Sequence, residues 1–166
     1  MKELESSKNK EPLKIGGWLI LIAIGIVFAP IRIFYSLSVD YPPIFSDGTW
    51  EVLTTKGSEL YSPVLSVFII GEIATNLLLA IAGIYMAYLF FTKKSAFPKW
   101  FLGLAVTSIV VILVDAYVVS LVIPNTEVFN ADTAQKLLRS GLALCLWSPY
   151  LFLSERSKNT FIKGRS

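Results

Sequence analysis

Residues 62–92, SPVLSVFIIGEIATNLLLAIAGIYMAYLFFT, decide the fold of this chain. The run is apolar almost throughout, and Glu72 is its only charged residue. A bilayer core of roughly 30 Å requires about 20 consecutive apolar residues in a helix, so this stretch is long enough to cross a membrane. The sequence therefore predicts a membrane-spanning helix that carries one acid near the middle of the bilayer.

Three more apolar runs reach the same length. Of all 166 residues 54% are hydrophobic and only 16% are charged, which leaves little chain for a soluble domain. We predict an all-α fold, a polytopic membrane four-helix bundle formed by one domain over 15–154. The four expected spans are 15–39, 62–92, 98–123 and 134–154. The remaining segments are a polar cytoplasmic tail (1–14), an external loop (40–61) and a basic cytoplasmic tail (155–166).

The basic residues gather on one side of this topology. They lie before the first span, between the second and third spans, and after the fourth span: Lys2, Lys8, Lys10, Lys14, Lys93, Lys94, Lys99, Arg156, Lys158, Lys163 and Arg165. The two other loops carry more acids than bases. Because basic loops stay in the cytoplasm, we expect both termini to be cytoplasmic (N-in/C-in). We interpret the basic tails as topology signals and expect no nucleic-acid partner.

Each expected span contains one charged residue of interest: Arg32, Glu72, Asp115 and Arg139. Such a residue costs on the order of 3 kcal/mol at mid-bilayer when unpaired, and less near the interface. Counting about 1.5 Å per helical residue places Glu72 near the middle and the other three in the outer third. Asn76 follows Glu72 by four residues and shares its helix face. We therefore expect a polar pocket open to the outside, with Glu72 at its floor.

Two interpretations of these charges stay open. In the functional one, the pocket binds a small polar ligand, or Glu72 accepts a proton. In the structural one, two acid–base pairs fix the order and register of the helices, as polar residues do in membrane bundles. Arg32 and Arg139 have a third role open to them, since long basic side chains near helix ends extend to the interface.

The composition excludes several classes of site. The chain has no histidine and a single cysteine, which excludes histidine-based metal and haem sites, histidine-dependent triads and an internal disulfide. We find no phosphate-binding glycine loop and no serine in a nucleophile-elbow setting. We therefore predict no metal and no cofactor, and we favour a non-enzymatic function.

Five short features together suggest a family. They are Gly16-Gly17-Trp18-Leu19, Glu72-x-x-x-Asn76, Phe97-Pro98-Lys99, Asp115 and Trp147-x-Pro149-Tyr150. This pattern resembles an uncharacterised bacterial family of small four-helix inner-membrane proteins, a family defined as a domain of unknown function. The resemblance covers about residues 14–161. It implies a four-helix fold in the bacterial inner (cytoplasmic) membrane, and it implies no activity.

We expect an integral inner-membrane protein that binds a partner protein, a lipid or a small polar ligand through the outward-facing pocket. The alternative is a small oligomeric proton-coupled transporter that uses Glu72, and a membrane enzyme comes third. The expected partners are the lipid bilayer and either a second copy of this chain or another membrane protein.

Overall fold

The computed structural model describes residues 11–122 and 127–163, which form helices joined by short loops. The helices in chain order are α2 (Trp18–Asp40), α3 (Pro42–Ser46), α4 (Thr49–Thr54), α5 (Pro63–Phe91), α6 (Phe97–Val122), α7 (Ala131–Leu153) and α8 (Glu155–Thr160). The long helices α2, α5, α6 and α7 overlap the four ranges expected to span the membrane. The expected end of the third span at residue 123 lies outside the described residues, as do parts of both expected tails, 1–10 and 164–166.

Three stretches are long and apolar enough to cross a membrane, Trp18–Ser46, Pro63–Phe91 and Phe97–Leu121. Helix α7 has 23 residues, as many as α2. It does not meet the same criterion, because Asp132, Lys136 and Arg139 lie in its first turns. The protein is therefore all-α, with three candidate membrane-spanning helices and a fourth long helix beside them.

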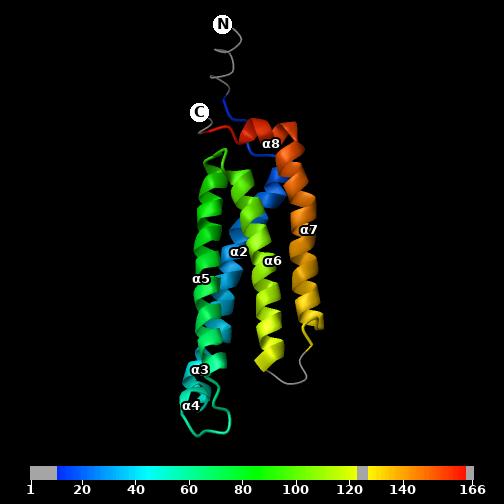
Figure 1. Cartoon of the computed structure of the whole chain (residues 1–166). Coiled ribbons are helices and arrows are strands. Elements are labelled where there is room, and N and C mark those ends of the chain that lie inside the picture. The colour runs from blue at the N-terminus through cyan, green and yellow to red at the C-terminus, as the bar shows by residue number, and fades with distance from the viewer. Residues whose placement is uncertain (1–10, 123–126, 164–166) are drawn as a thin grey trace.

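The long helices are packed as neighbours in the order α2–α5–α6–α7. In Figure 1, α2 lies behind α5 and α6 and crosses the bundle at an angle. Its first turn is near α7, where the rings of Trp18 and Trp147 are 6.4 Å apart, and its last turns are near the start of α5. The bundle is thus closed at the α8 end, whereas at the α3 end α2 has moved away from α7.

A close contact between α2 and α5 sets where these helices cross. Pro30 is buried inside α2, and a Cβ placed on Gly83 of α5 would stand 3.7 Å from the proline ring. The absence of a side chain at Gly83 lets the bulky ring approach the α5 backbone, as small residues do between membrane helices. A proline at this position also bends α2, because it cannot donate to the carbonyl four residues back.

The hydrophobic core lies at the α8 end of the bundle. It contains Leu19, Ile22, Ile26, Met86, Leu89, Phe90, Phe97, Leu151 and Phe161. Phe161, after α8, packs its ring 5.4 Å from that of Phe90 and 4.6 Å from that of Phe97. The C-terminal segment therefore completes the core rather than extending away from it.

Backbone hydrogen bonds hold the two ends of the described chain together. Leu13 N–H donates to the Asn159 carbonyl (3.1 Å), and Lys163 exchanges bonds with the α5–α6 loop, where its N–H reaches the Lys93 carbonyl (3.2 Å). The Arg156 side chain lies against Gly16, where an added Cβ would collide with the guanidinium. Both ends of the described chain thus lie on the same side of the bundle, beside the α5–α6 loop.

The segment between α2 and α5 packs back onto the start of α5. Ser62 N–H donates to the carbonyl of Leu53 on α4 (3.1 Å), and the Ser62 hydroxyl accepts from Leu65 N–H (3.3 Å) to cap α5. Hydrogen bonds from the side chain and backbone N–H of Thr49 lower the pKa of Asp47 and fix the start of α4. These contacts hold the end of α2 close to α5, where the candidate site is.

Candidate functional site

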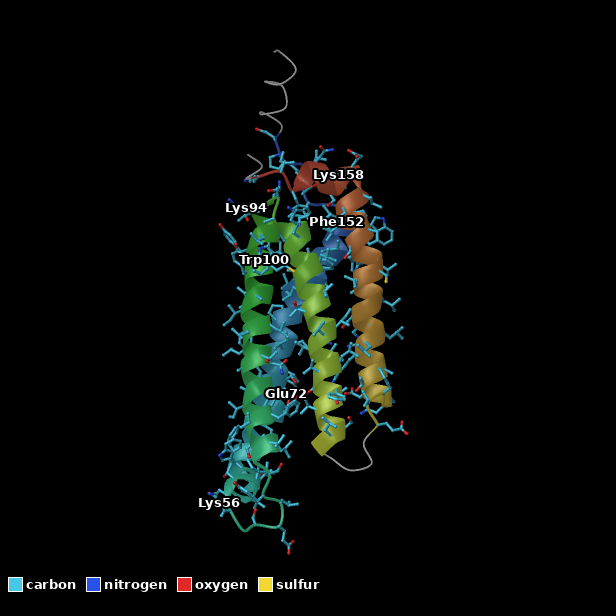
Figure 2. The ribbon with its side chains drawn as sticks, in the orientation of Figure 1. Lys56, Glu72, Lys94, Trp100, Phe152 and Lys158 are labelled. Carbon is cyan, nitrogen blue, oxygen red and sulfur yellow. The ribbon has the colours of Figure 1, made fainter. Side chains whose placement is uncertain are left out.

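Glu72 and Asn76 lie on the face of α5 that packs inward. The buried residues Ile69, Ala80 and Gly83 precede and follow them at helical spacing, three or four residues apart along one stripe. Both polar side chains are half-buried. Glu72 is about 13 Å along the helix from Pro63, counting about 1.5 Å per residue. In Figure 2 it lies in the half of the bundle opposite α8.

The first residue after α2 contacts both of these polar groups. The Asn76 side-chain nitrogen donates to the hydroxyl of Tyr41 over 3.4 Å. The Tyr41 side chain also interacts with the Glu72 carboxylate. Since the hydroxyl accepts from Asn76, its own proton is available to the acid. Tyr41 is half-buried, so it covers Glu72 from the side of α2 and α3.

Three charged groups from other elements act electrostatically on Glu72. They are Asp40 at the end of α2, Asp115 on α6 and Lys136 on α7. Lys136 also acts on Asp115, which is half-buried. Lys136 forms an ion pair with Asp132, with 2.8 Å between nitrogen and oxygen. The group as a whole is therefore net negative, with one lysine among four acids.

Pairing with the acids was one of the roles left open for Arg32 and Arg139. Among the described residues no nitrogen of Arg32 or Arg139 lies within 4 Å of a carboxylate oxygen of Glu72 or Asp115. Both arginines are exposed on the outside of the described bundle. Arg32 follows the buried Pro30 by two residues, about 200° around the helix, and therefore faces away from α5.

Two members of this group, Tyr41 and Lys136, were not predicted from the sequence. The sequence nevertheless contained a feature that indicates the position of each residue. Tyr41 stands directly before the prolines that begin α3, so its backbone position was fixed next to the end of the first span. Lys136 follows the buried Thr133 by one helical turn and so starts closer to the inward face than Arg139, which lies a further turn along, although the Lys136 side chain is 55% exposed.

The donor set of the described residues contains no group of three or more histidine, cysteine, aspartate or glutamate side chains placed to hold a metal ion. The polar cluster, defined here as Tyr41, Glu72, Asn76, Asp115 and Lys136, offers two carboxylates, a hydroxyl, an amide and an ammonium group. Such groups can bind an ammonium or hydroxyl group of a ligand through charge and hydrogen bonds, or transfer a proton.

A bundle with three candidate spans, a fourth long helix and acids among its apolar helices defines an α-helical membrane protein of the multi-pass class. The chain belongs to the family described as "Protein of unknown function (DUF2569)", which it matches over residues 12–162. This match covers most of the chain and bears out the expected membership in a domain of unknown function. No curated protein and no solved structure matches the chain significantly.

Proposed function

We propose that this protein is a non-enzymatic binder of a small polar ligand, and that the polar cluster is its site. The observation that carries this proposal is that Glu72 and Asp115 are half-buried on the neighbouring helices α5 and α6, while no described cation lies within 4 Å of either carboxylate. Two acids without a direct partner cost free energy among apolar helices. A positively charged ligand would offset that cost, so we infer a small ligand with an ammonium group.

The proposed orientation places this site toward the outside. We propose that all four long helices span a bacterial inner membrane and that both termini are cytoplasmic. Support comes from the basic residues at the α8 end and the acids Asp40, Asp47, Glu51 and Glu59 at the α3 end. The polar first turns of α7 would then lie in the outer part of the bilayer, beside Asp115.

The test is a thermal-stability screen of the purified protein in nanodiscs with small amines, amino acids and quaternary ammonium compounds. A bound ligand stabilises by about 2.7 kcal/mol at 100 times its Kd. We expect at least one compound to raise the Tm of the wild type and to leave Glu72→Gln and Asp115→Asn unshifted. Glu51→Gln, an exposed acid at the same end, is the matched control and should respond as the wild type does. Equal shifts in all four proteins, or none in the wild type, would refute the site.

A second candidate function is proton-coupled transport by an oligomer of this chain. The observation that favours it is that the Tyr41 hydroxyl, which accepts a hydrogen bond from the Asn76 amide, lies beside Glu72, because a proton path needs polar groups beside an acid. Four helices seldom enclose a pathway alone, so additional copies would be needed for alternating access. Uptake into vesicles should then depend on pH and disappear in Glu72→Gln, while binding without uptake would leave only the first function.

A further inference from the structure

A concave surface lies on α6, near the opposite end of the bundle from the polar cluster. It has a volume of about 330 Å³ and is lined by Lys99, Trp100, Gly103, Leu104 and Thr107. These positions are spaced by four residues in two adjacent rows, so they form one face of the helix. From Lys99 to Thr107 the groove follows α6 for about 12 Å.

The groove exists because a side chain is missing at Gly103. A Cβ placed there would have no neighbour within 4 Å, so the space above the backbone is empty of protein. Trp100 forms one wall and is 43% exposed. Its ring meets that of Tyr85 edge-on with 5.1 Å between centroids, and Tyr85 in turn stacks on Tyr88 at 6.1 Å. An aromatic wall of this kind is typical of the level at which lipid headgroups meet acyl chains.

The groove begins at a strongly basic end of the molecule. The described cations at this end of the molecule are Lys14, Lys93, Lys94, Lys99, Arg156, Lys158 and Lys163, against the acids Glu11 and Glu155. Figure 2 shows Lys94 and Lys158 at this end, with Trp100 slightly further along the bundle. Lys99 is exposed at the groove's basic end, and none of its described neighbours forms an ion pair with it. Lys158, by contrast, pairs with Glu155 at 3.3 Å.

We propose that this groove is a binding site for one anionic phospholipid. Lys99 binds the headgroup phosphate, Trp100 packs at the level of the glycerol, and the first part of an acyl chain lies over Gly103 and Leu104 beside Thr107. Charge complementarity selects an anionic lipid, because Lys99 forms no described ion pair and a shallow, mostly apolar surface continues from it along α6. The lipid site is independent of the polar cluster, from which it is separated along the bundle.

Native mass spectrometry of the full chain, released from nanodiscs containing equal amounts of phosphatidylglycerol and phosphatidylcholine, tests the proposal. We expect the wild type to retain one phosphatidylglycerol in preference to phosphatidylcholine. Lys99→Gln should lower that retention about fivefold, the effect of one basic residue near an anionic surface. Gly103→Leu fills the groove and should lower it at least as much. Its new side chain enters open space, and leucine is a better helix former than glycine, so the fold should persist.

Lys158→Gln is the matched control, since it removes a cation at the same end but away from the groove. It should retain lipid as the wild type does. An equal loss in Lys158→Gln and Lys99→Gln would mean general surface attraction and would overturn the site. So would a loss in only one of the two groove variants, or the absence of lipid preference in the wild type. A thermal-unfolding curve for each variant verifies that the fold is kept.

Discussion

The side-chain nitrogen of Asn76 and the hydroxyl oxygen of Tyr41 lie 3.4 Å apart, although 35 residues separate them in the chain. This contact joins the end of α2 to the middle of α5 and places a phenol beside Glu72. Through Tyr41, the chain between α2 and α3 is linked to the polar cluster on α5.

Replacing Tyr41 by Phe should therefore distinguish a contribution of the hydroxyl to stability from a contribution to ligand binding. The ring and its packing remain, and only a long, half-buried hydrogen bond is lost. We expect the free energy of unfolding to fall by about 1 kcal/mol or less, while affinity for the ligand found in the stability screen should fall clearly. Chemical unfolding in detergent and a ligand titration are the two measurements. Tyr35→Phe, an exposed tyrosine on α2, serves as control. A large stability loss with unchanged affinity would make Tyr41 a structural residue.

Gly83→Leu should disturb the crossing of α2 and α5. Its side chain would extend into the Pro30 ring, and overpacking of this kind costs about 1–3 kcal/mol. Gly25→Leu on α2 makes the same change in helix propensity where a Cβ meets nothing within 4 Å. The unfolding free energies of the two variants should differ by that amount, with Gly83→Leu the less stable. Equal stabilities would mean that the helices do not cross at these residues.

Phe161→Ala should be among the most destabilising single changes near the C-terminus. The ring is 3% exposed between Phe90 and Phe97, and truncation of a buried Phe costs about 3–5 kcal/mol. Phe152→Ala on α7, where the ring is 39% exposed, should cost about 1 kcal/mol or less. Thermal unfolding in detergent compares the two. Similar losses would show that the C-terminal segment does not dock on the bundle.

The proposed orientation predicts which loops react from outside the cell. With the single cysteine removed by Cys145→Ser, new cysteines at Lys56 and Lys158 report on the α3 and α8 ends, where both side chains are exposed. We expect a membrane-impermeant maleimide to label Lys56→Cys in intact cells and Lys158→Cys only after permeabilisation. The reverse pattern would invert the topology and place the polar cluster at the cytoplasmic side.

The helices could be predicted from the sequence because length and apolar composition are properties of single segments. Local features such as the Ser62 cap of α5 also depend on a single segment, since the serine hydroxyl accepts from Leu65 N–H within its own turn. The packing of the helices against one another was harder to predict from the sequence. Helices α2, α5 and α6 carry apolar side chains on all of their faces. The pattern of apolar residues along each helix therefore does not reveal which face turns inward.

The charged residues illustrate this limit. Counting residues gave their depth along each helix but not their direction around it. For Arg32, pairing with the acids and extension to the interface were both open, and its Cα lies about 200° from Pro30 around α2. Glu72 and Asn76 follow the stripe of Ile69, Ala80 and Gly83, which only the packed structure identifies as the inner one. Lys136 lies on α7, which is more polar than the other long helices. There the pattern of polar and apolar residues could have predicted that this lysine lies near the acids.

The most direct test of the account is the stability of Glu72→Gln against wild type in nanodiscs. The substitution removes the charge and keeps the shape, and it replaces one acceptor oxygen with an NH2 donor. Because no described cation pairs directly with Glu72, its charge is retained at a cost to folding, as groups at functional sites often are. The account predicts an unchanged or higher free energy of unfolding. A loss of about 3 kcal/mol or more is what breaking a buried ion pair produces, and it would show that Glu72 holds the helices together rather than forming a binding site.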